Sequence, residues 1–185
     1  MTNFMSSPHY DYSSTQIMVP YLLSNEILRW GDDHISDELL YADPENPIFG
    51  REDEPHVTAI YGLHTDHPEE VQRIVEDVDA FEIRLGKVSI FTMCSKFDVI
   101  KIEVDSPALH KLNFMLRQLP NTQYYSTFRP HITIAYLKKG AGQELVGDTT
   151  FLNRYWVPKS VVFSSRNNTR TIIPLKFKLL QRKVS

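Results

Sequence analysis

Cysteine, basic charge and long apolar stretches are all scarce in this chain. Cys94 is its only cysteine, which excludes an internal disulfide and any metal site built from several thiolates. No apolar run approaches the roughly 18–20 residues that span a bilayer. The opening residues MTNFMSSPHYDYSST also lack the basic and then apolar pattern of a secretory signal. We therefore expect a cytoplasmic protein that does not enter a membrane.

The charge and the size of the chain limit its partners and its organisation. Its formal net charge is −3 at pH 7, which disfavours broad binding to duplex nucleic acid but allows a small anionic ligand in a local pocket. With 185 residues, of which 42% are hydrophobic, the chain can bury one sizeable core. We predict a single bilobed domain over residues 1–185, with the first ~10 residues flexible. The sequence does not indicate the oligomeric state.

Hydrophobic periodicity and turn residues predict strands that alternate with helices along the whole chain. Strands are expected at 13–20, 56–61, 81–93, 97–104, 131–137, 159–165 and 171–180, the last two forming a hairpin around 166–168. Helices are expected at 22–30 and from Ser36, Pro68 and Pro107, with a charged, proline-rich loop at 41–55. This order predicts an α+β fold of two pseudo-symmetric lobes. Each lobe would be a mostly antiparallel sheet with a covering helix, and a cleft would separate the two.

One seven-residue pattern occurs twice. The segment PHVTAIY at 55–61 recurs as PHITIAY at 130–136, so the two histidines lie 75 residues apart. A single His-x-Thr or His-x-Ser triplet is expected by chance in a chain of this composition. The whole repeated pattern is much rarer, which indicates an internal duplication with a shared purpose.

Strand geometry makes this repeat a candidate catalytic site. Alternate side chains of a strand share a face, which places His56 with Thr58 and His131 with Thr133. The other positions are predicted to face a covering helix: Val57, Ala59, Tyr61, Ile132, Ile134 and Tyr136. Two such strands side by side would present two imidazoles and two hydroxyls to one cleft. Near neutral pH one histidine can accept a proton and the other can donate one, while the hydroxyls bind phosphate oxygens.

The duplicated motif resembles the 2H phosphoesterase superfamily. Its members carry two His-x-Thr/Ser motifs on equivalent strands of two pseudo-symmetric lobes, and they include the LigT-like RNA phosphodiesterases. The resemblance extends from about Ser13 to the end of the chain. It implies a metal-independent phosphodiesterase without a cofactor, in which His56 and His131 are the acid and the base and Thr58 and Thr133 hold the phosphoryl group. Which histidine has which role stays open.

A narrower resemblance concerns the segment GREDEPHVTAIYGLHTDHPE, at 50–69. It is similar to phage-encoded members of the superfamily, among them the anti-CBASS nucleases that destroy cyclic oligonucleotide signals. That similarity implies cleavage of the 3′–5′ bonds of a cyclic di- or trinucleotide in the host cytosol, as a phage counter to CBASS immunity. In those enzymes aromatic side chains clasp the bases, and Tyr12 and Trp156 are the candidates for this role.

Other interpretations stay open beside these. The enzyme could instead act on 2′,3′-cyclic or 2′-5′-linked RNA, or the chain could be a catalytically silent nucleotide-binding module. Buried structural histidines, or threonines that merely favour strands, would not explain the repeated register of the two pairs. His64 and His67 could ligate a metal, but a turn with Asp66 near the start of the next helix is favoured. A tryptophan such as Trp156 more often anchors a core or a loop than binds a base.

Overall fold

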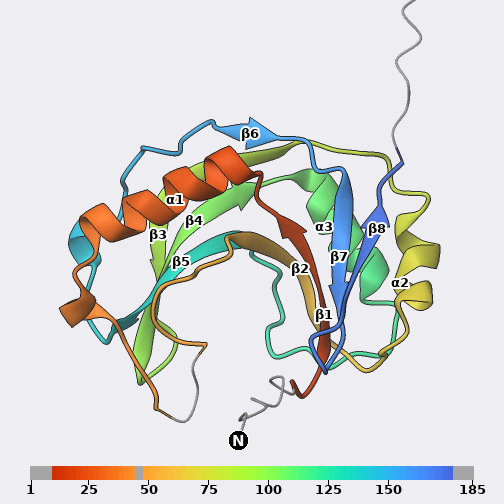
Figure 1. Ribbon diagram of the computed structural model, residues 1–185, viewed down its shortest axis with the longest axis horizontal. Helices are drawn as coiled ribbons and strands as arrows, with labels where there is room; N and C mark the ends of the chain where they lie inside the picture. The colour runs from red at the N-terminus through yellow and green to blue at the C-terminus, as the bar shows by residue number, and fades with distance from the viewer. Residues whose placement is uncertain (1–9, 45–47, 177–185) are drawn as a thin grey trace, which may run out of the picture.

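One curved sheet of eight strands forms the body of the protein (Figure 1). The structure is a computed structural model that describes residues 10–44 and 48–176. Its strands are β1 Ser13–Met18, β2 His56–Leu63, β3 Ile83–Phe91, β4 Phe97–Asp105, β5 His131–Lys138, β6 Tyr155–Trp156, β7 Ser160–Ser164 and β8 Arg170–Pro174. Its helices are α1 Tyr21–His34, α2 Pro68–Val75 and α3 Pro107–Leu116, with short 3₁₀ turns at Asp37–Leu39 and Gln143–Leu145.

The strand order shows that the sheet consists of two halves of four strands each. The order is β6-β3-β4-β5-β2-β1-β7-β8, and every pair of neighbouring strands is antiparallel. The predicted α+β fold with two pseudo-symmetric lobes is therefore confirmed, and the two lobes are halves of one continuous sheet. They meet where β2 pairs with β5. The sheet bends into an arch, and the helices lie on its outer side (Figure 1).

The two helices that cover the centre of the sheet exchange halves. Helix α1 follows β1 along the chain but packs on β5, and α3 follows β4 but packs on β2. Gly31 of α1 allows a close approach, because a Cβ there would lie 3.2 Å from a side-chain carbon of Ile134. Buried apolar side chains from both halves form one cluster, which includes Ile27, Val57, Leu112 and Ile132. The crossed helices hold the two halves together as one hydrophobic unit.

Most predicted elements are present, with shifted ends and some differences. The short helix expected from Ser36 is a 3₁₀ turn that the Ser36 hydroxyl caps by accepting a bond from the amide of Glu38. Strand β6 was not predicted, because two residues carry no periodic signal. The first nine residues and the end of the expected strand at 171–180 lie outside the described part of the chain. Within that part, no helix is long and apolar enough to cross a membrane.

Each repeated strand contains a β-bulge at the same position of the repeat. In β2, Thr58 and Ile60 pair with successive residues of β1, so Ala59 is the extra residue. In β5, Thr133 and Ala135 pair with successive residues of β4, so Ile134 is the extra residue. A bulge shifts the alternation of side chains by one place.

The bulges correct one expectation about the faces of these strands. Strict alternation predicts that Tyr61 and Tyr136 face a covering helix with the apolar residues. Instead, both residues at each bulge are buried, namely Ala59 with Ile60 and Ile134 with Ala135. The tyrosine that follows each pair therefore emerges on the face of the histidines, and Tyr61 is 42% exposed.

Each bulge leaves a backbone carbonyl that accepts a hydrogen bond from outside the strand ladder. The carbonyl oxygen of Ala59 accepts a bond of 2.6 Å from Nδ2 of Asn113, a buried residue of α3. The carbonyl oxygen of Ile134 accepts a bond of 2.9 Å from the amide of Glu52. The distorted register is thus stabilised by neighbouring elements in both halves.

We predict that Asn113→Leu destabilises the fold by about 1–3 kcal/mol, because the buried carbonyl of Ala59 would lose its donor. Urea unfolding monitored by circular dichroism measures this difference. Lys111→Leu, at an exposed position of the same helix, is the matched control and should stay within about 0.5 kcal/mol. Equal midpoints for the two variants would contradict the role of this bond.

Candidate active site

The four predicted motif residues lie on one face of the sheet, at the line where its halves join. Val57 pairs with Ile132 across this line, and both side chains are fully buried on the helix side. Extending this antiparallel register by one residue each way sets His56 opposite Thr133 and Thr58 opposite His131. All four of these side chains are partly exposed. The pairing of β2 with β5 therefore brings the two motifs together on one face, as the sequence predicted.

The register also sets the spacing of the two imidazoles. His56 and His131 form a diagonal pair across antiparallel strands, for which about 7 Å between Cβ atoms is typical. Thr58 and Thr133 form the other diagonal pair of these four positions. A phosphoryl group is small enough to lie among the four, with a ring on either side.

Both histidines are oriented by the same hydrogen bond. Nδ1 of His56 lies 2.8 Å from the carbonyl oxygen of Glu54, and Nδ1 of His131 lies 2.8 Å from that of Arg129. A carbonyl oxygen only accepts, so Nδ1 carries the proton in each ring. Nε2 of each neutral ring then keeps its lone pair for proton transfer. In both cases a proline separates the histidine from the carbonyl, and its fixed φ holds the backbone in place.

The two histidines differ in their surroundings. The ring of His131 meets the Phe91 ring edge to face at 4.9 Å between centroids. Burial lowers the pKa of His131, and the positive charges of Lys101 and His56 lower it further, against the opposing effect of the bond to Arg129. On the other side, burial raises the pKa of Glu52, while the nearby charge of His56 lowers it. Lys101 thus acts on the pKa of His131, and the charge of His56 acts on the pKa of Glu52.

An aromatic cluster lies near the end of β2 that is remote from His56. The Tyr12 ring stacks on His64 at 5.6 Å, and it meets Tyr61 at 5.9 Å and Tyr124 at 6.3 Å edge to face. Tyr12 was predicted as a base-binding residue, and it directly precedes β1, the strand that pairs with the first motif strand. The sequence analysis missed the other three members. Tyr61 ends the first motif and His64 follows it by three residues, whereas Tyr124 lies ahead of the second motif, so no local pattern in the sequence groups them.

Trp156 is not brought to the motif strands. It lies in β6 at the far edge of the sheet, opposite Ile83, with β3 and β4 between it and β5. Its side chain is 8% exposed and belongs to the hydrophobic core. The alternative interpretation of Trp156 as a core anchor agrees with this position, so we leave it out of the candidate site.

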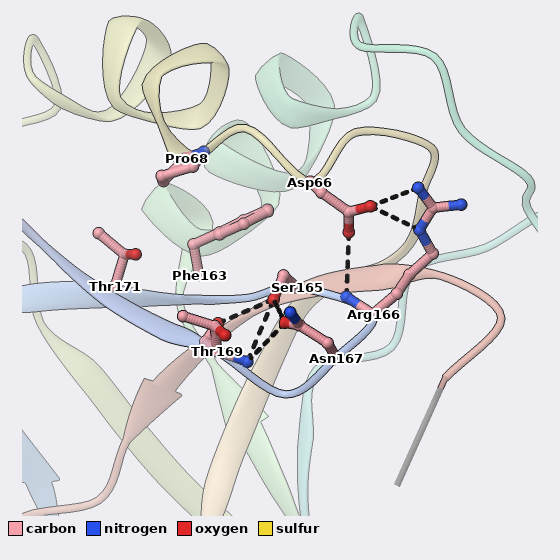
Figure 2. A pocket seen from close by; sticks show the side chains of 8 residues that line it. All are labelled: Asp66, Pro68, Phe163, Ser165, Arg166, Asn167, Thr169 and Thr171. Carbon is pink, nitrogen blue, oxygen red and sulfur yellow. Dashed lines mark hydrogen bonds and ion pairs between the residues drawn. The ribbon is translucent and has the colours of Figure 1, made fainter. Parts of the chain in front are cut away.

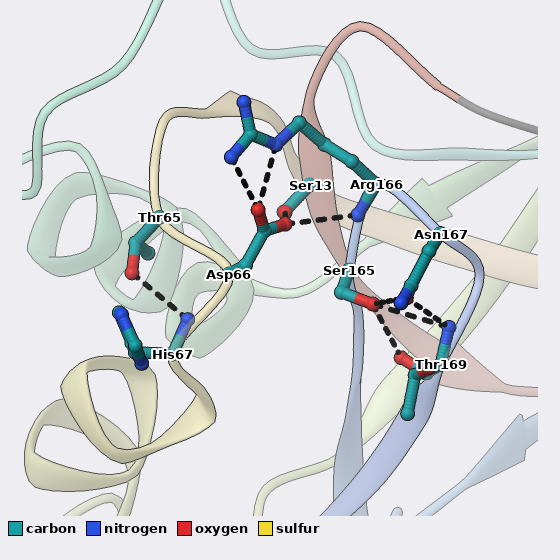
Figure 3. Close-up of polar contacts among 8 residues, drawn as sticks. All are labelled: Ser13, Thr65, Asp66, His67, Ser165, Arg166, Asn167 and Thr169. Atoms are coloured by element: carbon teal, nitrogen blue, oxygen red, sulfur yellow. Dashed lines mark hydrogen bonds and ion pairs between the residues drawn. The ribbon is translucent and has the colours of Figure 1, made fainter.

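The loop around His64 and His67 carries a carboxylate that joins two parts of the sheet (Figure 3). Asp66 accepts hydrogen bonds from the Ser13 hydroxyl at 2.9 Å, from the Arg166 amide at 3.0 Å and from the Arg166 guanidinium. Asp66 does lie just before α2, as expected, but its carboxylate joins β1 to the β7–β8 hairpin and does not cap the helix. Among the described residues, no three His, Cys, Asp or Glu side chains gather as a metal site.

Two hollows lie beside this framework, and neither is lined by a motif histidine. The larger, of about 540 Å³, is bordered by Asp66, Arg166 and the polar end of the β7–β8 hairpin (Figure 2). The smaller, of about 230 Å³, lies between α1 and β5, and Thr133 is the one residue of the two His-x-Thr pairs that lines it. We place the candidate site by the chemistry of the strand junction and not by these hollows.

We predict that Asp66→Asn lowers the free energy of unfolding at pH 7 and that this difference shrinks in acid. Hydrogen bonds from Arg166 hold the pKa of Asp66 well below its usual range. A lowered pKa gives stability that is present above about pH 4 and is lost as the pH falls toward the folded-state value. Thermal melts from pH 7 to pH 2 measure the difference. Asp33→Asn, at an exposed position of α1, is the control, and a constant difference at all pH values would contradict the assignment.

The fold and the duplicated histidine strands define the class of LigT-like 2H phosphoesterases. A sequence profile of the 2′-5′ RNA ligase superfamily matches residues 34–165, so the chain belongs to that superfamily. No match was found among curated protein sequences.

Solved structures with the same fold cover nearly the whole chain. Escherichia coli LigT complexed with 3′-AMP is 16% identical with a TM-score of 0.61, covering 89% of this chain and 95% of that one. The protein TT0787 of Thermus thermophilus is 14% identical with a TM-score of 0.58, covering 88% and 94%. A structure described as a phosphoesterase is 20% identical with a TM-score of 0.59, covering 91% and 96%. At these identities the likeness shows the fold alone.

Proposed function

We propose that this protein is a metal-independent phosphodiesterase that cleaves the 3′–5′ bond of a small ribonucleotide, with His56 and His131 as its acid–base pair. The observation that carries the proposal is the matched orientation of the two rings. Each donates Nδ1–H to the carbonyl two residues before it, which leaves two Nε2 atoms on one face of the sheet. Two proton carriers on either side of a phosphoryl group are what acid–base cleavage of a phosphodiester requires.

The ribose 2′-hydroxyl is the nucleophile in this proposal. One Nε2 takes its proton, the 2′ oxygen forms a bond to phosphorus, the bond to the 5′ oxygen breaks, and the other Nε2 gives that oxygen a proton. Thr58 and Thr133 donate hydrogen bonds to the non-bridging oxygens, where negative charge increases in the transition state. Attack within the substrate has a large effective-concentration advantage over attack by water. The first product is then a 2′,3′-cyclic phosphate.

The substrate we propose is a cyclic di- or trinucleotide signal. The cluster of Tyr12, Tyr61, His64 and Tyr124, at the end of β2 opposite His56, offers rings on which a base can stack while the phosphoryl group lies between the histidines. The LigT structures with 3′-AMP, ATP and NADP⁺ support a nucleotide ligand for the fold. Cleavage of such a signal would suit a phage protein that counters CBASS immunity in the host cytosol. The alternatives are a 2′,3′-cyclic or 2′-5′ RNA phosphodiesterase and a silent nucleotide-binding module.

We predict that His56→Ala and His131→Ala each lower turnover by about a hundredfold or more, as loss of a positioned acid or base typically does. Chromatography of cyclic dinucleotides, 2′,3′-cyclic nucleotides and 2′-5′ oligoadenylates measures the rate and distinguishes the alternatives. His67→Ala, an exposed histidine outside the motifs, is the control and should leave the rate unchanged. Near-normal rates in either motif variant would reject the assignment, and so would a loss with EDTA that added zinc restores.

We predict that a 2′-deoxy ligand binds but resists cleavage, because it lacks the proposed nucleophile. Mass spectrometry of the products from matched ribo- and 2′-deoxy cyclic dinucleotides tests this, alongside a binding assay that shows both ligands enter the site. The ribo ligand should give a 2′,3′-cyclic phosphate first. Comparable cleavage of the deoxy ligand, or a product with a 5′-phosphate and a free 3′-hydroxyl, would identify water as the nucleophile instead.

A further inference from the structure

A lysine inside the sheet has no role in the mechanism described so far. Lys101 lies in β4, paired with Thr133 of β5, so it neighbours the second motif. It is only 6% exposed, and Nζ donates a 2.6 Å bond to the Ser89 hydroxyl and lies 4.3 Å from the centre of the Phe91 ring. The same Phe91 ring contacts His131. The ammonium group of Lys101 and the His131 imidazole therefore contact the same aromatic ring.

The charge of this lysine is incompletely balanced. In the part of the chain that the structure describes, no carboxylate forms an ion pair with Lys101. Glu103 lies two residues along β4 and pairs with His131, but it is exposed to solvent. Burial and the charge of Arg129 lower the pKa of Lys101, whereas Glu103 raises it. A positive charge in such surroundings is only weakly screened from its neighbours.

The equivalent position in the other half carries no charge. In β1, Gln16 pairs with Thr58 as Lys101 pairs with Thr133 in β4. The Oε1 atom of Gln16 is buried and accepts no hydrogen bond from the described residues. The ionisable neighbour of His56 is instead the carboxyl group of Glu52. The backbone of the site is therefore nearly symmetric, whereas its charges are not.

We infer that Lys101 is a positioning residue that makes the two histidines inequivalent, so that His131 is the general base and His56 the general acid. This inference rests on the proposed function. A cation beside the His131 imidazole disfavours its protonated form, which suits that ring to accept a proton and leaves the donation of a proton to His56. Nε2 of His131 then takes the 2′-hydroxyl proton, and Nε2–H of His56 protonates the departing 5′ oxygen. The same pair, with its protons exchanged, is ready to open the cyclic phosphate with water.

The assignment of acid and base is tested with two matched ribonucleotide 3′-diesters. One has a 5′-nucleoside as its leaving group, and the other has 4-nitrophenolate, which leaves without needing a proton. His56→Ala should lose about a hundredfold or more on the nucleoside diester but less than about tenfold on the nitrophenyl diester. His131→Ala should lose about a hundredfold on both. The opposite pattern, or equal losses for both variants on both diesters, would overturn the assignment.

The role of Lys101 is tested by NMR titration of the two histidines, assigned through His56→Asn and His131→Asn. Lys101→Gln copies the other half of the sheet, and Lys101→Met is a second neutral variant in case the first does not fold. In either neutral variant, the pKa of His131 should rise, so that the ring keeps its proton to a higher pH. Lys101→Arg, which keeps the charge, should preserve the native titration, and Lys87→Met, at an exposed position of β3, should not change it.

Activity gives a matching signature. Losing the cation should lower turnover by about three- to tenfold on the acidic limb of the pH–rate profile and by less than about twofold on its plateau. An unchanged His131 titration in a folded neutral variant would overturn the inference. If the native protein cleaves neither diester, the proposed function is wrong, whereas the titration still decides whether Lys101 makes the histidines inequivalent.

Discussion

The pairing of β2 with β5 is the constraint on which the rest of the molecule depends. Val57 and Ile132 meet there on the helix side of the sheet and are fully buried. Because strand side chains alternate, the burial of these two apolar residues forces the neighbouring histidines and threonines onto the opposite face. A shift of one residue in this register would exchange the two sets. The hydrophobic core therefore determines the geometry of the polar site, and the crossed packing of α1 and α3 holds the two halves in that register.

The matched bulges in β2 and β5 also determine which side chains face the site. Strict alternation in β2 and β5 would send Tyr61 and Tyr136 into the helix layer. The extra residue in each strand turns them onto the polar face, and it leaves a carbonyl whose hydrogen bond comes from Asn113 in one half and from Glu52 in the other. Both donors come from segments distant in sequence, so the shape of the site and the stability of the fold depend on the same contacts.

The symmetric backbone alone does not determine which histidine is the acid and which is the base. The two histidines share the same hydrogen bond to a preceding carbonyl and lie at equivalent strand positions. A reaction that removes one proton and donates another needs rings in different protonation states. The two histidines differ in the side chains on the strands beside them. Lys101 of β4 occupies the position that Gln16 of β1 occupies in the other half. In the proposed mechanism, the two repeated strands supply the proton carriers, and the differences between their neighbouring side chains supply the asymmetry.

Local patterns in the chain were enough to predict the α+β class, the location of nearly every strand and helix, and the four motif residues as a group. Those follow from short-range periodicity and from a fixed offset between two copies of one pattern. The fold also places Trp156 in the core, one of the two roles that the sequence left open. Two features emerged only in the folded molecule: Asp66 joins β1 to the last hairpin, and Lys101 neighbours the second motif. They depend on which strands become neighbours and where a bulge reverses the alternation. Both are set by packing and hydrogen bonds between residues far apart in the chain, of which a single sequence carries no local trace.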